Sequence, residues 1–263
     1  MTATLQPGAG GHGARPEPEP PRPRRPLIEL SGLLLREQAR ASPDLPPAPL
    51  DLVVPRGEMV MLTGQARSGR SELLNVLGLL DRPAAGSYLL NGIDTGKLRD
   101  RQRSALRCRQ IGFVFQRKMV LPTRSVLDNV MLPLRYAGLP RRQRLEAAGE
   151  SLDRVGLTDM ASRMAWQLSA GELALCALAR ALVTKPSLVL CDEPTSGLDQ
   201  SAAARVIGVL AHLHREGRTV VLATADQLAA AYSGRSVRLG EPAGALAWQM
   251  RLPITDTQAG SLP

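Results

Sequence analysis

The sequence of 263 residues is poor in aromatic residues, in cysteine and in lysine. Phe, Trp and Tyr together make up 3% of it, so no series of aromatic side chains is available to stack on single-stranded nucleic acid. The three cysteines (Cys108, Cys176 and Cys191) are widely spaced, which excludes a disulfide framework and a CxxC metal or redox pair. No apolar run approaches the roughly 18–20 residues of a membrane-spanning helix, so we expect no such helix.

Lysine is scarce because arginine takes its place. Only Lys97, Lys118 and Lys185 are lysines, although Lys and Arg together number 33 against 24 Asp and Glu, for a net charge of +9. Such a charge is compatible with nucleic acid or an anionic membrane surface as a partner. The arginines are spread along the chain, however, which favours a GC-rich coding sequence that encodes Arg in place of Lys. We therefore expect no nucleic-acid partner.

The composition divides the chain into three parts. Residues 1–26 are rich in Pro, Gly and Arg and lack the apolar segment of a secretory signal peptide, so we expect a disordered leader. Residues 27–240 carry the hydrophobic patterns of a single domain, in which a helical insertion is predicted at about 118–165. Residues 241–263 show no clear period and are expected to form a loose tail.

Strands and helices alternate along the predicted domain. Several strands are apolar throughout, as in SLVLC at 187–191, which is typical of a parallel sheet covered on both faces. The pattern therefore predicts an α/β fold. Strands are expected at 27–35, 58–62, 111–116, 187–191, 219–223 and 236–239, and helices at 99–109, 201–216 and 226–232, with a long helix from the segment LSAGE to residue 182.

A glycine-containing loop, GQARSGRSE at 64–72, follows the strand at 58–62 and opens a helix. Its spacing, Gly64-x-x-x-x-Gly69-Arg70-Ser71, is that of a P-loop, in which backbone amides cradle phosphates and the Ser hydroxyl reaches Mg²⁺. Arg70 stands where the motif has Lys. The loop predicts a phosphate site, but this variant taken alone is a weak signal.

Two adjacent carboxylates, Asp192 and Glu193, follow the apolar strand at 187–191 and begin the segment DEPTSGLD. Carboxylates at a buried strand end are costly unless they meet a cation. We therefore predict that Asp192 binds Mg²⁺ and that Glu193 polarises an attacking water. Gln116, at the end of the strand at 111–116, is predicted to coordinate the metal or the water.

The segment LSAGE at 168–172 precedes the long helix. Ser169 and Gly171 offer a hydroxyl and an amide as donors to a phosphate. Trp166, just ahead of this segment, is expected to pack beside it and not to serve as a platform for a ligand.

From about Leu27 to Leu239 the chain resembles the ATP-binding cassette of ABC transporters. The family's motifs occur in order: Walker A at 64–72, a Q-loop at Gln116, the signature LSAGE, Walker B with DEPTSGLD, and a switch region after the strand at 219–223. The stretch IGFVFQ…SVLDNVMLPLRYAGLP is most similar to the lipoprotein-release and macrolide-export branch. The resemblance implies a P-loop NTPase-type, mostly parallel sheet with an antiparallel β subdomain and an inserted helical subdomain.

The resemblance also implies cofactors, partners and a location. Two cassettes, in a homodimer or a heterodimer, sandwich two ATP molecules head to tail, each site pairing one subunit's Walker A with the other's signature. The Q-loop and helical insertion grip a membrane permease at the cytoplasmic face of the plasma membrane.

The implied site residues follow from the matched motifs. ATP contacts are expected from Gly64, Gln65, Ala66, Arg67, Ser68, Gly69, Arg70, Ser71, Glu72, Ser169, Ala170, Gly171, Glu172 and Asp199. Mg²⁺ ligands are expected from Ser71, Gln116 and Asp192, and catalysis from Glu193 and Gln116, with Ala225 at the switch-histidine position.

The sequence departs from the family pattern at positions that contact nucleotide. Arg67 replaces a Gly, Arg70 replaces the Lys, and Glu72 replaces a Thr and brings a carboxylate to where phosphate oxygens are expected. Ala170 adds a Cβ to the signature, and Ala225 removes the switch histidine. The family's adenine-stacking aromatic, expected near Arg36 or Glu37, is missing, because no Phe, Trp or Tyr precedes Tyr88.

These departures leave three hypotheses about the function open. The favoured one is a nucleotide-binding subunit of an export-type transporter whose hydrolysis is weakened, since the loss of one acid/base or phosphate-binding group typically costs about 10²–10⁴-fold in rate. The alternatives are a non-hydrolysing scaffold or regulator of a permease and, less favoured, a soluble basic ABC protein associated with nucleic acid.

Overall fold

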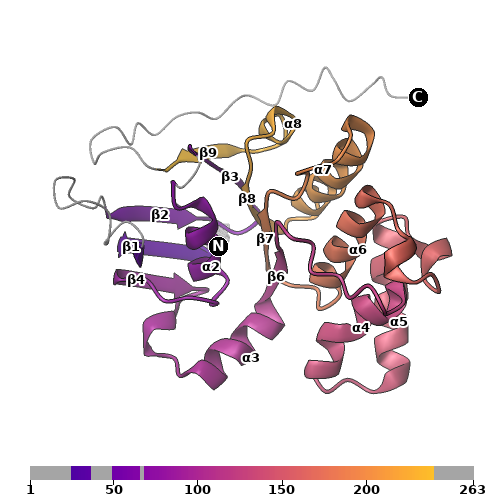
Figure 1. Ribbon diagram of the computed structural model, residues 1–263. Helices are drawn as coiled ribbons and strands as arrows, with labels where there is room; N and C mark the ends of the chain where they lie inside the picture. The colour runs from indigo at the N-terminus through magenta and orange to yellow at the C-terminus, as the bar shows by residue number, and fades with distance from the viewer. Residues whose placement is uncertain (1–24, 37–48, 66–67, 240–263) are drawn as a thin grey trace, which may run out of the picture.

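The structure, a computed structural model, describes residues 25–36, 49–65 and 68–239. Within these residues it contains two sheets flanked by helices (Figure 1). The antiparallel sheet has the strand order β2-β1-β4-β5, and the parallel sheet has the order β6-β7-β8-β3-β9. The predicted α/β fold class is confirmed. The strands are β1 (Ile28–Leu34), β2 (Leu50–Val54), β3 (Met59–Thr63), β4 (Ala85–Leu90), β5 (Ile93–Asp94), β6 (Ile111–Val114), β7 (Leu188–Asp192), β8 (Thr219–Ala223) and β9 (Arg235–Arg238).

The central strands of the parallel sheet are buried on both faces, as their apolar sequences predict. Every residue of β7 and β8 is buried. Alternate residues of β7 enter two different cores, because successive side chains of a strand point to opposite faces. Leu188 and Leu190 pack on the side of the antiparallel sheet, and Val189 and Cys191 pack on the side of the large helices.

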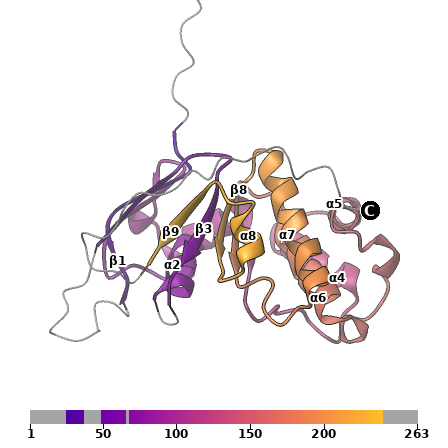
Figure 2. The same cartoon turned by 90° about the horizontal axis from the view of Figure 1, so that it is seen from above.

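The helices occupy both sides of the parallel sheet. Helix α2 packs against β7 and β8, and its buried leucines share a core with the antiparallel sheet (Figure 2). On the other side, α6 packs against β6 and against α4, α5 and α7. The helices are α2 (Arg70–Leu77), α3 (Asp100–Gln110), α4 (Val126–Tyr136), α5 (Arg141–Arg154), α6 (Ala170–Leu182), α7 (Gln200–Arg215) and α8 (Gln227–Ala230), with short 3-10 helices at Thr95–Lys97, Thr158–Met160 and Ala165–Gln167. No helix of the described residues has the length and apolar composition needed to cross a membrane.

Some predictions differ from the structure or fall outside it. The strand predicted at 111–116 ends at Val114, because the pairing with β7 stops at Val114 opposite Cys191, one residue before β7 ends at Asp192. Gln116 therefore lies in an exposed bend beyond the strand. The described residues do not include 1–24 of the predicted leader, the predicted tail at 241–263, or Glu37.

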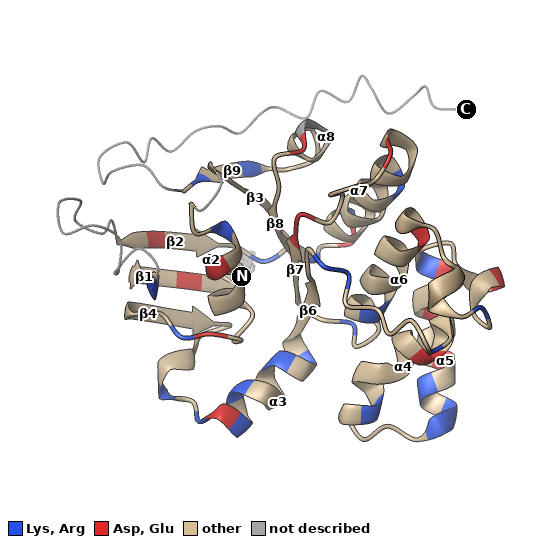
Figure 3. Ribbon diagram, in the orientation of Figure 1, with Lys and Arg blue, Asp and Glu red and all other residues tan. Residues whose placement is uncertain are grey.

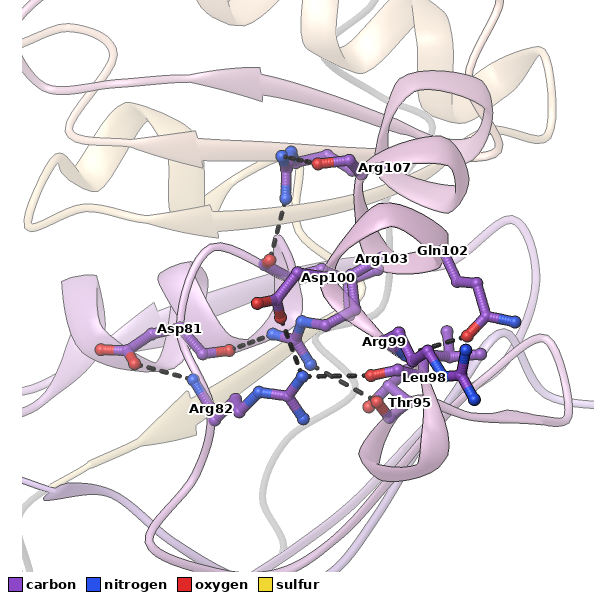
Figure 4. Close-up of polar contacts among 11 residues, drawn as sticks. Asp81, Arg82, Thr95, Leu98, Arg99, Asp100, Gln102, Arg103 and Arg107 are labelled. Carbon is purple, nitrogen blue, oxygen red and sulfur yellow. Dashed lines mark hydrogen bonds and ion pairs between the residues drawn. The ribbon is translucent and has the colours of Figure 1, made fainter.

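Helix α3 is attached to the rest of the fold by arginine side chains (Figure 4). Arg103 is 5% exposed and donates to the backbone carbonyls of Asp81 and Thr95. Arg107 donates to the Leu79 carbonyl at 2.9 Å, and Arg82 pairs with Asp100 at 2.9 Å. Guanidinium groups with several fixed donors suit this role, since each satisfies more than one acceptor.

Replacing Arg103 with Leu is expected to lower the free energy of unfolding by about 1–3 kcal/mol, because the carbonyls of Asp81 and Thr95 lose the donor that the buried guanidinium provides. Urea unfolding of the full chain measures the change. Arg101→Leu is the matched control, because Arg101 is exposed on the same helix and should change stability by less than about 0.5 kcal/mol. Equal losses in the two variants would contradict the anchoring role of Arg103.

Candidate functional site

The loop between β3 and α2 requires glycine at both ends. Gly64 has φ +148°, and a Cβ there would lie 2.5 Å from Ser68 Oγ and 2.7 Å from the Leu239 carbonyl oxygen. Gly69 has φ +87° and is the N-cap of α2. The Gln65 carbonyl accepts from the Ser68 amide at 3.1 Å, which closes a turn. The sequence motif thus forms a tight loop that opens a helix, although Ala66 and Arg67 lie outside the described residues.

Arg70, the first residue of α2, forms an ion pair with Glu193. Its Nη1 lies 3.2 Å from Glu193 Oε1, and the side chains are 16% and 22% exposed. Glu193 follows β7 at φ +43°, and its amide donates to the Ala223 carbonyl of β8 at 2.8 Å. The sequence placed both residues in the site but did not predict that they pair, because the pairing depends on how α2 packs against β7.

Asp192, the last residue of β7, is 9% exposed. Burial raises the pKa of its carboxyl above the usual range, while hydrogen bonding from Ser71 and the charge of Arg70 lower it in part. Among the described residues, Asp192 Oδ1 and Ser68 Oγ are buried without a hydrogen-bond partner. Buried oxygens without partners call for a ligand, water or ion.

The donor set around Asp192 suits magnesium. A carboxylate, the Ser71 hydroxyl and an amide oxygen are the hard oxygen ligands that this ion prefers. Asp192 and Ser71 are adjacent in the structure. Gln116, the third predicted ligand, is exposed in the bend after β6.

The Glu72 carboxylate is hydrogen-bonded to the backbone beyond the glycine loop. Its Oε1 accepts a hydrogen bond from the Arg36 amide at 2.6 Å, just after the end of β1. The reason is that the amide following the last strand residues needs an acceptor. The Arg36 side chain is held by the Arg82 carbonyl at 3.1 Å and lies 3.9 Å from Asp81.

The segment LSAGE forms the N-terminus of α6. Ser169 is the N-cap, and its hydroxyl and amide donate to Glu172 Oε2 at 2.8 and 2.7 Å, while the Glu172 amide donates back to Ser169 Oγ at 3.3 Å. These hydrogen bonds from Ser169 lower the pKa of Glu172. Ala170 is exposed, and a Cβ on Gly171 would lie 2.8 Å from Ala202 Cβ, so Gly171 allows α6 to approach α7.

The prediction that Trp166 packs beside this segment is wrong. Its side chain is 67% exposed, because the 3-10 helix at Ala165–Gln167 turns it away from the core that takes up Ala165 and Leu168.

Asp199 caps helix α7. Its Oδ1 accepts from the Ser201 hydroxyl at 2.7 Å and from the Ala202 amide at 2.9 Å, and these bonds lower its pKa. An Asp directly before a helix is a cap signal that the sequence itself contains.

Lys118 and Arg180 connect the loop after β6, which contains Gln116, to α6 and to the segment that follows β7. The sequence analysis predicted a role for neither residue. Arg180 on α6 donates to the carbonyls of Met119 at 2.7 Å and Lys118 at 3.0 Å. Lys118 donates to the Ser196 carbonyl at 3.0 Å, three residues beyond Glu193. Burial lowers the pKa of both basic groups. No sequence signal marks them, because their partners are backbone carbonyls distant along the chain.

Ala225 is exposed two residues after the end of β8, in a segment that is hydrogen-bonded to the segment that follows Glu193. Thr195 donates to Asp226 Oδ2 at 2.9 Å, and the Asp226 amide donates to Thr224 Oγ1 at 3.0 Å. The structure thus brings together Arg70, Ser71, Asp192 and Glu193. The hydrogen bonds of Ser169 and Glu172 stay within the first turn of α6.

Comparison with known proteins shows which family this chain matches. Residues 48–196 match the sequence family described as ABC transporter. The macrolide export ATP-binding/permease protein MacB of Rhodopseudomonas palustris is 39% identical over 90% of this chain and 36% of its own length. The ABC transporter ATP-binding protein YknY of Bacillus subtilis is 39% identical over 72% of this chain and 82% of its own. The chain thus spans about a third of the length of its MacB-type relatives.

Solved structures agree with the sequence comparison. The dimeric structure of the ABC transporter cassette MJ0796 is 32% identical, with a TM-score of 0.72 over 81% of this chain and 94% of that one. A second dimeric structure of the same cassette, bound to ADP and Pi in a post-hydrolysis state, has a TM-score of 0.71 at 30% identity. On these grounds the chain belongs to the family of ABC transporter ATP-binding cassettes.

Proposed function

We propose that this chain is the nucleotide-binding subunit of an export-type transporter, which couples ATP binding and hydrolysis to a membrane permease. The observation that carries the proposal is the gathering of Arg70, Ser71, Asp192 and Glu193 beside the loop between Gly64 and Gly69. Relatives named as export ATP-binding/permease proteins support the export class.

Each part of the site has a proposed task. The loop from Gly64 to Glu72 binds the phosphates through its amides, and Ser71, Asp192 and Gln116 hold Mg²⁺, which neutralises charge on the phosphate oxygens. Glu193 accepts a proton from the attacking water. The signature residues from Ser169 to Glu172, with Asp199, contact the nucleotide of a second cassette, in a homodimer or a heterodimer.

Hydrolysis by this chain is proposed to be weak. The Arg70 guanidinium pairs with Glu193 at 3.2 Å, which diverts the carboxylate from an attacking water and the guanidinium from phosphate. Ala225 provides no imidazole to contact a phosphate or move a proton. Both defects lie in groups that act on the reacting atoms.

A groove between α3 and the helices α4 and α6 is proposed as the site that binds the permease. It has a volume of about 680 Å³ and lies among α3, β6, α4 and α6, where it is lined by Phe113, Phe115, Met119 and Tyr136. Tyr136 is 81% exposed and Met119 is 60% exposed. Because Arg180 holds the Met119 carbonyl, a partner in this groove contacts the loop of Gln116. This docking places the chain at the cytoplasmic face of the plasma membrane.

A scaffold without turnover is the second candidate function, and the Arg70–Glu193 ion pair is the observation that favours it. A nucleic-acid role has less support. Figure 3 shows basic residues along α3 and α5 with acidic ones among them, and several basic side chains of the chain are ion-paired.

Equilibrium binding of MgATP to the full chain tests the proposed site. Saturable binding below millimolar ATP is expected, and Asp192→Asn should weaken the Mg²⁺-dependent part about tenfold or more because a charged ligand is lost. Asp128→Asn is the control, since Asp128 is ion-paired to Arg135 on α4. The absence of binding at millimolar ATP would contradict the transporter function, and binding without turnover would favour the scaffold.

A further inference from the structure

Trp166 is presented to solvent on a fixed piece of backbone. It lies in the middle of the 3-10 helix at Ala165–Gln167, directly before α6, and is 67% exposed. The amides of Ala165 and Trp166 donate to the carbonyls of Arg124 at 3.0 Å and Pro122 at 3.3 Å, and Gln167 Oε1 accepts from the Met164 amide at 3.0 Å. The indole is therefore held outward by the backbone on both sides of it.

Among the residues that the structure describes, no aromatic side chain lies near the glycine loop to stack on a nucleotide base. No Phe, Trp or Tyr precedes Tyr88 in the sequence. Tyr88 is 2% exposed and its hydroxyl donates to the Leu77 carbonyl at 3.0 Å. Arg36, at the end of β1, directs its guanidinium to the Arg82 carbonyl. A base bound beside α2 thus finds no stacking partner among the described residues of its own subunit.

We propose that Trp166 stacks on the purine base of the nucleotide held by a second copy of the cassette. The proposal rests on the proposed function, in which Ser169 and its neighbours face the phosphates of a second cassette. Trp166 lies three positions before Ser169, a span of at most about 11 Å, so a nucleotide whose phosphates meet Ser169 has its base within reach of the indole. Stacking on an aromatic ring recognises the flat face of a base and tolerates its identity.

The same surface also suits a permease partner, and the test distinguishes that partner from a base. Met119 and Leu121 are also exposed, at 60% and 42%, and Trp166 is bonded to the backbone of Pro122. A permease covering this patch would bury the indole without any effect of the base. The decisive property is therefore whether Trp166 responds to a base or only to a protein partner.

Tryptophan fluorescence tests the contact directly. The chain has two tryptophans, so a Trp248→Phe background leaves Trp166 as the reporter. Mg²⁺ with the ATP analogue AMP-PNP should quench Trp166, and Mg²⁺ with tripolyphosphate, which has no base, should not. Quenching should increase with protein concentration, because the ring and the bound nucleotide belong to different subunits. Quenching that is independent of protein concentration would overturn the inference.

Affinity gives the second measurement. Trp166→Ala should weaken AMP-PNP binding about tenfold and leave tripolyphosphate binding unchanged, and Trp166→Phe should retain most of the affinity. Ile93→Ala is the control, an exposed apolar side chain on β5 that should not change either affinity. If Trp166→Ala leaves the AMP-PNP affinity unchanged, whether or not it lowers permease binding, the inference about Trp166 is overturned and the proposed function is not. Failure of every variant to bind nucleotide would overturn the proposed function as well.

Discussion

Replacing Glu193 with Gln is expected to lower the rate of ATP hydrolysis by about 10²–10³-fold, the usual cost of losing a positioned base. The same change should tighten ATP binding, because Arg70 loses its carboxylate partner at 3.2 Å and its charge becomes available to phosphate. Single-turnover hydrolysis of radiolabelled ATP and equilibrium binding measure the two effects separately. A lower rate together with higher affinity is a combination that unfolding of the site would not produce.

Glu58 provides a matched control for this substitution. Its side chain is also 22% exposed, and it is ion-paired to Arg235 at 3.1 Å on the same parallel sheet. Glu58→Gln should leave both the rate and the affinity unchanged within about twofold, because the loss of a partly exposed ion pair away from the site changes the free energy of the protein only slightly. A hydrolysis rate that survives Glu193→Gln would show that this carboxylate does not act on the water and would favour the scaffold function.

Replacing Arg70 with Lys is expected to raise the rate of hydrolysis by about tenfold. Arg70 presents a broad planar fork that reaches Glu193, whereas Lys presents a compact charge on a flexible stem, which can leave the carboxylate and follow the phosphate. Released from the ion pair, the Glu193 carboxylate is then available to an attacking water. The gain in rate is limited because position 225, an alanine, still provides no imidazole. We therefore expect an increase well below the roughly 10²–10⁴-fold that a positioned acid or base contributes to a rate.

Arg235→Lys is the corresponding control, because Arg235 is 23% exposed and makes the matched pair with Glu58. Steady-state ATPase rates of the two variants at saturating MgATP decide the comparison. A rate that falls in Arg70→Lys would mean that the guanidinium itself has become part of the catalytic arrangement. An equal gain in both variants would point to a general effect of lysine on the sheet.

The fold was predictable because its signals are local. Apolar runs such as Leu188–Cys191 must be covered on both faces, and the glycines at 64 and 69 mark the backbone angles of the loop. The end of β6 was not predictable, because the apolar pattern continues to Phe115 while the pairing with β7 stops at Val114. Strand ends depend on the partner strand, which no local pattern reports.

The members of the site were predictable, and their interactions were not. By itself the sequence determined the family, the order of its motifs and the positions that depart from them, since these properties reside in residue types and spacings. Tertiary structure alone decided that Arg70 pairs with Glu193, that Glu72 serves the Arg36 amide, that Arg180 holds the loop of Gln116, and that Trp166 faces solvent. The physical reason is that charge pairing, hydrogen bonding and burial depend on distances between segments far apart in the chain, which packing sets only once the two sheets and their helices are assembled.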